Sequence, residues 1–152
     1  MKNFLLLICL ASLIISCGKK KAEKQAKIDD DLISAYITEN GISATKTSSG
    51  LYYYIENQGN GASCNSFSDV RVAYKGYFLD GSVFDESSAQ GISFNLQQVI
   101  KGWTEGLQLM NEGAKYKFYI PSNLAYGERG AGGVIPPNTD LIFEVELIKI
   151  NQ

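Results

Sequence analysis

The chain of 152 residues contains no histidine, and this absence narrows the chemistry that it can perform. Triads of serine, histidine and aspartate need an imidazole base, as do paired cysteine and histidine nucleophiles. Zinc sites that depend on imidazole ligands are excluded for the same reason. Chemistry here must therefore rest on carboxylates, tyrosine hydroxyls, backbone groups or the shape of a pocket, and we expect neither a metal nor a cofactor.

The strongest single candidate for a polar group with a chemical role is Asp85, which follows Phe84 at the end of a short apolar segment. A carboxylate beside an aromatic ring is hard to explain as packing, because burying a charge is costly. Tyr126 lies in a glycine-containing loop, where its hydroxyl could hold a substrate or only pin the loop. Taken singly, three further candidates are better explained as ordinary core: Tyr74, Val99 and Phe143.

The only tryptophan of the chain, Trp103, begins a short helical pattern. Trp103, Leu107 and Met110 recur at positions i, i+4 and i+7, which is one face of a helix. The pattern predicts about two helical turns, with Gly113 as the C-terminal cap. We expect this helix to lie on a sheet, with Trp103 as the floor of a cleft between them.

The sheet is predicted from alternating or aromatic-rich segments, and Asp80-Gly81 is a hairpin turn signal between two of them. Gly76 is expected to bend the longest central segment. A long loop follows over residues 124–138. The pattern is neither regular βαβ nor all-β, and it indicates the α+β class: an antiparallel sheet of five to six strands with one short helix on one face. The predicted strands cover residues 51–56, 70–78, 82–85, 92–96, 115–120 and 141–150.

Composition places the chain among globular proteins with one domain and some additional segments. Apolar residues make up 45%, enough for a buried core, and the formal charge of -2 gives no basic footprint for nucleic acid. Cys64 is the one cysteine outside the N-terminal 17 residues. Without a histidine to activate it we interpret it as incidental, so stability must come from the core rather than from disulfides.

Residues 1–16 are typical of a targeting segment, with Lys2 before an apolar run that is too short to span a membrane comfortably. The run ends in Ile14-Ile15-Ser16-Cys17-Gly18, which resembles a bacterial lipobox. That resemblance implies cleavage before Cys17 and lipid on Cys17, in the cell envelope of a bacterium, facing the periplasm. The alternative is an ordinary signal peptide with a chance cysteine; the position of Cys17 favours the lipoprotein.

Residues 17–50 are predicted to form a lipidated tether and a short helix. The lysine-rich residues 18–27 are expected to be flexible, either near anionic head groups or as a solvated spacer. Residues 28–40 predict a helix with Asp29, Asp30 and Asp31 at its N-terminus and a stop at Asn40-Gly41. The helix could mediate dimerisation, but its short length favours packing on its own domain in a monomer. Its apolar face comprises Leu32, Ile33, Tyr36 and Ile37.

Six short runs follow one another from residue 70 onward: VAYKG (72–76), DGSVFD (80–85), VIKGW (99–103), LAYG (124–127), VIPP (134–137) and LIFEVEL (141–147). In their order and spacing they resemble the FKBP-type peptidyl-prolyl cis-trans isomerases. Each matching run alone is a weak signal, but six in the family's order form a strong one, and together they span nearly all of residues 52–150. The resemblance implies an isomerase domain over residues 51–152, with a curved sheet wrapped on the short helix.

The resemblance also implies a set of site residues. Trp103, Phe84 and Phe143 would hold a proline ring, and the Tyr126 hydroxyl and the Ile100 N–H would bind substrate carbonyls. Asp85 would polarise the amide within a hydrogen-bond network that includes Tyr74. Two positions depart from the family pattern: Ala131, where many members have a polar residue, and Ile92, where the prototypes have an aromatic one. The remaining implied substrate contacts are Val99, Val134 and Ile135.

The implied activity is rotation about Xaa-Pro bonds, which would assist the folding of exported proteins. Implied partners are proline-containing polypeptides, with immunosuppressive macrolides as further ligands. An alternative from another class stays open: a non-catalytic module that binds proline-containing segments of a membrane-associated complex.

Overall fold

The computed structural model describes residues 2–151, and it describes side chains from residue 18 onward. Two α-helices, two short 3-10 helices and seven strands follow in the order α1, β1 to β5, α2, β6, η1, η2, β7. The helices are α1 (Lys2–Glu39), α2 (Lys101–Leu107), η1 (Ser122–Leu124) and η2 (Gly127–Arg129). The strands are β1 (Thr45–Lys46), β2 (Tyr52–Asn57), β3 (Asp69–Tyr77), β4 (Val83–Glu86), β5 (Ile92–Asn95), β6 (Lys115–Ile120) and β7 (Leu141–Asn151).

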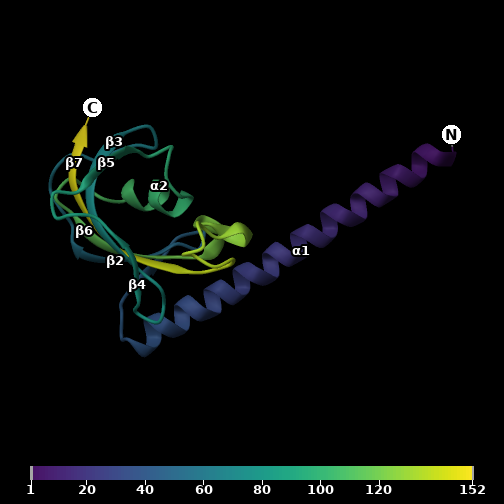
Figure 1. Ribbon diagram of the computed structural model, residues 1–152, viewed down its shortest axis with the longest axis horizontal. Coiled ribbons are helices and arrows are strands. Elements are labelled where there is room, and N and C mark those ends of the chain that lie inside the picture. The colour runs from purple at the N-terminus through teal and green to yellow at the C-terminus, as the bar shows by residue number, and fades with distance from the viewer. Residues whose placement is uncertain (1, 152) are drawn as a thin grey trace.

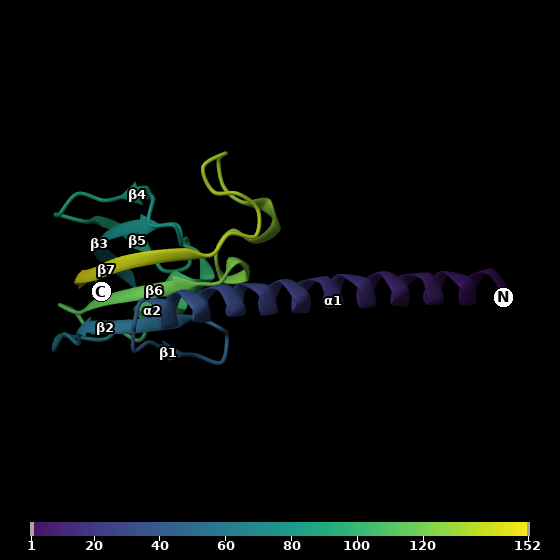
Figure 2. The same cartoon turned by 90° about the horizontal axis from the view of Figure 1, so that it is seen from below.

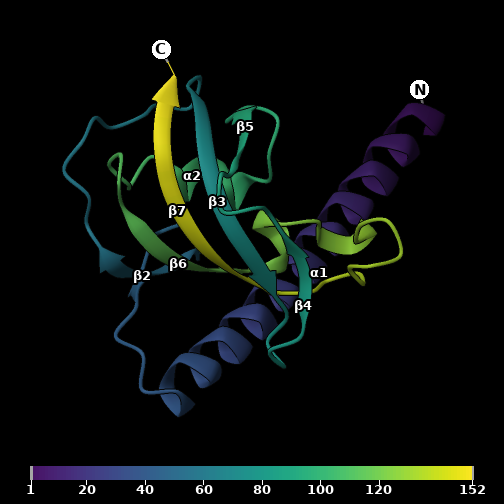
Figure 3. The ribbon, with the colours of Figure 1, turned by 60° about the vertical axis from the view of Figure 1, so that its left-hand side comes forward.

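The strands form one antiparallel sheet in the order β1-β2-β6-β7-β3-β4, with β5 paired to β3 beside β4. The sheet curves around α2, and its long central pair β3 and β7 is seen side by side in Figure 3. The predicted α+β class and wrapped helix are confirmed. The seventh strand, β1, is a two-residue edge strand within residues 17–50, where the sequence predicts only a tether and a short helix.

The concave face of the sheet carries the main core, because alternate residues of each strand point toward α2. Trp103, Leu107 and Met110 are all buried there, as the helical spacing predicted. Two glycines let α2 approach the sheet closely: a Cβ at Gly106 would lie 2.7 Å from the Phe118 ring, and one at Gly102 would lie 2.5 Å from Ile120. The helix is therefore fixed by shape as well as by its apolar face.

The expected cap of α2 at Gly113 is wrong. The helix ends at Leu107, and Gln108 is its C-cap. Gly113 instead adopts a positive φ of 86° in the turn before β6, where its N–H donates to the Leu147 carbonyl. A glycine at positive φ marks a turn as readily as a helix end, so the sequence signal is the same in both cases.

Helix α1 is much longer than predicted, and its first half extends away from the sheet (Figures 1 and 2). The prediction of a flexible segment over residues 18–27 is wrong, since these residues are helical. They are mostly lysine, alanine, glutamate and glutamine, which are strong helix formers. The salt bridges Lys19–Glu23 and Lys27–Asp31, at spacing i,i+4, add modest support.

The last turns of α1 pack on the convex face of the sheet. Ile33 is fully buried against Tyr119 and Ile142, with Tyr36 and Ile37 beside it, so the helix packs on its own domain as preferred. The predicted stop is confirmed, because α1 ends at Glu39. Two details are wrong: Leu32 is 50% exposed, and Asp29 to Asp31 lie within α1 rather than at its N-terminus.

The predicted cleavage and lipidation site at Cys17 lies outside the residues whose side chains are described. Within the described part of the chain, no helix combines the length and apolarity that a membrane crossing requires.

Candidate functional site

A cavity of about 340 Å³ opens between α2 and the concave face of the sheet, near the β3–β4 hairpin. Most of the side chains expected at the site line it, and they come from strands, α2 and the loop after β6. The structure thus brings together residues that are up to about 70 positions apart, from Tyr74 to Phe143. The expected residues on its walls are Tyr74, Phe84, Asp85, Ile92, Val99, Ile100, Trp103, Tyr126 and Phe143.

Gly76 makes room for two of the aromatic walls. It lies opposite Phe143 on β7 and opposite Asp85 on β4. A Cβ at Gly76 would lie 2.6 Å from the Phe84 ring and 3.0 Å from the Phe143 ring. The two rings therefore cover the bare backbone of β3 and meet edge to face, with centroids 5.4 Å apart. The register also shifts at Gly76–Tyr77, as the expected bend requires.

Trp103 is 5% exposed and lies at the centre of the aromatic cluster. Its ring is edge to face with Tyr74 at 5.0 Å and with Phe143 at 5.1 Å, and tilted against Phe94 at 5.4 Å. Such pairs add about 0.5–1.5 kcal/mol each beyond the burial of their surface. The indole is thereby held rigidly, and the cavity floor is preorganised.

Asp85 and Tyr74 form the polar edge of the cavity. The Tyr74 hydroxyl donates a 2.6 Å hydrogen bond to Asp85 Oδ2, which is the network that the resemblance implied. Burial, reinforced by the bond to Asp85, raises the pKa of Tyr74 well above its usual value. The Tyr74 phenol therefore stays protonated and continues to donate its hydrogen bond to Asp85 Oδ2. Because Asp85 is exposed, its other carboxylate oxygen is free to accept a hydrogen bond from a ligand.

Two further polar groups lie at the rim. Tyr126 is 39% exposed, and burial together with the Asp85 charge raises the pKa of its hydroxyl, so it remains a donor. Ile100 is the N-cap of α2, and its carbonyl accepts from the Trp103 and Thr104 N–H groups. The backbone of Ile100 is extended, just before α2 begins, and Ile100 lines the cavity.

The structure does not bring Val134 and Ile135 to the cavity. Ile135 is buried in the main core, and Val134 is 58% exposed. Glycines 130, 132 and 133 have positive φ, and they turn the loop tip so that it stands away from the sheet (Figure 2). Ala131 forms a backbone bridge with Ile135 instead of facing the cavity. A loop path set by three glycines at positive φ cannot be inferred from a motif alone.

Two wall residues were missed from the sequence, Phe94 and Gln98. Phe94 follows Ile92 by two positions on β5, so both side chains lie on the same face of the strand. The two-residue period could have identified Phe94 as the aromatic neighbour of Trp103. No comparable signal pointed to Gln98.

Other reactive groups lie apart from this cavity. The Cys64 thiol is half-buried and donates to the Leu107 carbonyl at 3.1 Å, and burial raises its pKa. A thiol of raised pKa is a weak nucleophile, which supports an incidental role. Among the residues that the structure describes, no three acidic or cysteine side chains gather as a metal site.

Comparison with known proteins agrees with this geometry. Residues 61–148 match the family model of the FKBP-type peptidyl-prolyl cis-trans isomerases. A Haemophilus influenzae protein named as a probable FKBP-type isomerase is 46% identical over 143 residues, covering 91% of this chain and 59% of its own. The outer membrane protein MIP of Legionella longbeachae is 42% identical, covering 88% of this chain and 57% of its own. The chain thus spans somewhat over half of these relatives.

A solved structure extends the likeness to three dimensions. The peptidyl-prolyl cis-trans isomerase of Pseudomonas syringae is 37% identical, with a TM-score of 0.75, and the match covers 86% of this chain and 96% of that one. The family match includes more than half of the chain and all of the aromatic cavity. The chain therefore belongs to the FKBP-type peptidyl-prolyl cis-trans isomerase family.

Proposed function

We propose that the chain catalyses cis-trans isomerisation of Xaa-Pro bonds. The observation that carries this proposal is the cavity itself, a rigid aromatic enclosure with one hydrogen-bonded carboxylate at its edge. Its size suits a proline ring and its flanking peptide groups. Rotation about the Xaa-Pro bond breaks no covalent bond, so it requires neither a nucleophile nor a general base.

The barrier to rotation about the peptide bond determines what a catalyst must do. Rotation about a peptide bond costs about 18–20 kcal/mol because the twisted amide loses resonance, whereas the two Xaa-Pro isomers differ by only about 0.5–1 kcal/mol. The catalyst need only bind the twisted amide better than the planar one. Trp103, Phe84 and Phe143 would hold the ring while the Tyr126 hydroxyl and the Ile100 N–H fix the flanking carbonyls. Asp85 would act on the rotating amide.

Exchange NMR on a short Xaa-Pro peptide tests the activity. We expect acceleration by the chain, and a fall in kcat/KM of about tenfold or more for Phe84→Ala and for Asp85→Ala, since about 1.4 kcal/mol of lost stabilisation is a factor of ten. Phe67→Ala is the matched control, because Phe67 is 69% exposed and does not line the cavity. Absence of acceleration by the folded chain, or full activity in both cavity variants, contradicts the proposal.

The proposed substrates are proline-containing segments of exported polypeptides. The half-exposed Ile92 leaves one wall open toward solvent, which suits an extended chain passing through the cavity.

We propose immunosuppressive macrolides as competing ligands, and Ile92→Phe, which restores the aromatic of the prototypes, is expected to tighten their binding. Competition between macrolide and peptide in the same NMR assay measures this. We also propose a monomer, which sedimentation equilibrium checks.

We propose that lipid on Cys17 anchors the chain to a membrane of the bacterial envelope, facing the periplasm. The lipobox-like residues 14–18 support this, as do the exposed lysines that follow them and the name of the Legionella relative. Those lysines would also be attracted to anionic head groups. A Cys17→Ser variant should appear in the soluble fraction of cells, and its continued partition with membranes would contradict lipidation.

A further inference from the structure

Asp29 is a buried carboxyl side chain that no function proposed so far explains. It lies within α1 with none of its surface exposed. One carboxylate oxygen accepts from the Gln25 amide at 2.6 Å, and the other accepts from the Ser122 hydroxyl at 2.7 Å and the Ser122 N–H at 3.1 Å. A buried side chain held by three donors on two elements fixes one register between helix and domain.

Ser122 is the first residue of η1 and lies four positions before Tyr126. The intervening chain is a tight turn, in which the Leu124 N–H donates to Pro121 and the Ala125 N–H donates to Ser122. Motion at Ser122 is therefore passed to Tyr126 through few rotatable bonds. Helix α1 also reaches the same loop through the salt bridge Lys21–Glu128, but both partners are more than 60% exposed, so that pair holds weakly.

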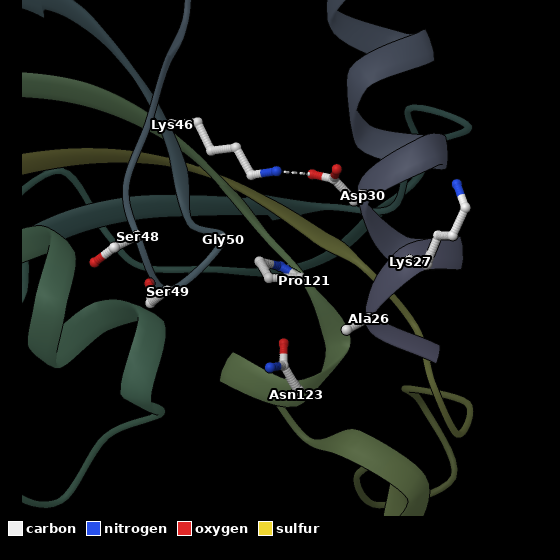
Figure 4. Close-up of a pocket in the computed structure, with 9 residues that line it drawn as sticks. All are labelled: Ala26, Lys27, Asp30, Lys46, Ser48, Ser49, Gly50, Pro121 and Asn123. Atoms are coloured by element: carbon white, nitrogen blue, oxygen red, sulfur yellow. Dashed lines mark ion pairs between the residues drawn. The ribbon is translucent and has the colours of Figure 1, made fainter. Parts of the chain in front are cut away.

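A second set of polar contacts joins α1 to the sheet, and solvent reaches it. Asp30 pairs with Lys46 and accepts from the Tyr52 hydroxyl, beside a pocket of about 330 Å³ between α1 and the turn after β1 (Figure 4). Farther along that turn, the Ser49 hydroxyl donates to Glu105 of α2 at 2.6 Å. These groups are reached by solvent, and water can replace each bond. The contact of Asp29 with Ser122 is the link that water does not replace.

We infer that Asp29 is a positioning residue for the cavity: through Ser122 it fixes the start of the loop that carries Tyr126. The inference rests on the proposed isomerase function, because Tyr126 matters only as a substrate contact. Helix α1 thereby becomes part of the site, although none of its side chains described from residue 18 onward lines the cavity.

Asp140 completes the cluster from the start of β7. Its Oδ1 accepts from the same Ser122 N–H at 3.0 Å. Two carboxylates share one donor, and burial together with the Asp29 charge raises the pKa of Asp140 to about 7. The groups facing the cluster are Gln25 and Asp29 of α1 and Ser122 of η1, while the nearby Lys27 and Lys46 pair with Asp31 and Asp30. Asp140 therefore keeps its proton to a higher pH than an ordinary carboxyl group does.

Substitutions in the full-length chain test the inference. Asp29→Ala is expected to lower kcat/KM for an Xaa-Pro peptide about threefold to tenfold, since small displacements of a positioned group are costly. Asp29→Asn retains an acceptor oxygen toward Ser122 and should restore the rate to within about twofold. Asp31→Ala, on the exposed side of the same helix, is the matched control. In a Tyr126→Phe background the effect of Asp29→Ala should fall below about 1.5-fold, because both changes act on one contact.

Hydrogen exchange at the Leu124 and Ala125 amides separates this inference from the proposed function. Asp29→Ala should speed exchange there at least about fivefold, while Asp31→Ala leaves it unchanged. Ser122→Ala replaces Asp29→Ala if the latter folds poorly. An effect of Asp29→Ala on kcat/KM that persists undiminished with Tyr126→Phe overturns the inference, as does unchanged exchange at both amides. If the wild-type chain shows no isomerase activity, the proposed function fails and exchange alone decides the inference.

Discussion

The two faces of the sheet differ in composition and in what packs on them. The concave face is aromatic and tightly spaced, with Gly76, Gly102 and Gly106 admitting rings and α2 at close range. The convex face carries cross-strand ion pairs, and α1 packs on it with Ile33 against Tyr119 and with the buried Asp29 bound to Ser122. Shape fixes the concave face, so each of its residues should be costly to change. Most charges on the convex face are exposed, so only its buried groups should matter.

Trp103→Ala should have the largest effect, because it empties the centre of the concave cluster. Removing a buried aromatic costs about 3–5 kcal/mol of unfolding free energy, and we expect a raised KM as well. Urea unfolding and peptide kinetics measure the two effects. The comparison variant is Asp85→Ala, which should lose activity with little change in stability because Asp85 is exposed. Equal destabilisation by the two variants would contradict the view that Trp103 supports the fold whereas Asp85 acts only on the substrate.

Asp140→Asn tests the buried carboxylates of the other face. In the folded chain burial raises the pKa of Asp140 from its usual 3.8 to about 7, so the folded state binds more protons between these values. Stability should therefore fall as the pH rises through this window. At about 1.4 kcal/mol per pKa unit, the fall is on the order of 2–4 kcal/mol.

The asparagine variant cannot ionise, so this part of the pH dependence should vanish. Above pH 7 the variant should be more stable than the wild type, and near pH 4 the two should be alike. Urea unfolding at several pH values measures the difference, with Asp31→Asn as an exposed control on α1. A wild-type chain whose stability is flat between pH 4 and 7 would contradict the assignment of the proton to Asp140.

Tyr119→Phe is expected to stabilise the chain by about 1 kcal/mol. The Tyr119 hydroxyl is buried beneath α1, and it has no hydrogen-bond partner among the described residues. An unsatisfied buried hydroxyl carries a desolvation cost of about 1–3 kcal/mol, and phenylalanine of the same shape removes it. Thermal unfolding gives the sign; a loss of stability would show that the hydroxyl has a role in docking α1.

The smallest effect should come from the exposed ion pair between Lys115 and Glu146, which face each other across β6 and β7. Both side chains are at least 42% exposed, so their coupling should be about 0.2–0.5 kcal/mol and should weaken in salt. A double-mutant cycle with alanine at both positions measures it. A coupling above about 1 kcal/mol would mean that the exposed part of the convex face is more rigid than we describe.

The sequence predicted those parts of the fold that depend on local periodicity. Alternation along residues 141–150 indicated both the strand and its buried face, and the i, i+4, i+7 spacing from Trp103 predicted which side of α2 is buried. Residues of the cavity could be named because six short motifs recur in a known order. These motifs do not determine the path of a loop, and Val134 and Ile135 are the two expected contacts that do not line the cavity.

The continuation of α1 through residues 18–27 could not be predicted from the apolar pattern, because that stretch has almost none. Its lysines suggested a flexible segment, although the same residues are good helix formers. The contact that holds the helix in place joins Asp29 to Ser122, 93 positions apart. Three consecutive aspartates suggested a helix N-terminus, and only the folded chain shows that one of them is a buried contact.

Helix α1 is continuous between Cys17 and Asp29, so it determines the distance between these two residues. At about 1.5 Å of rise per residue this stretch is about 18 Å long. With lipid on Cys17, this stretch would hold the domain at a set distance from the anchored residue, so the domain would not sweep the whole volume that a slack linker allows. The molecule would then serve polypeptides that pass within a narrow layer above the membrane, and inserting glycines near residue 22 would widen that layer.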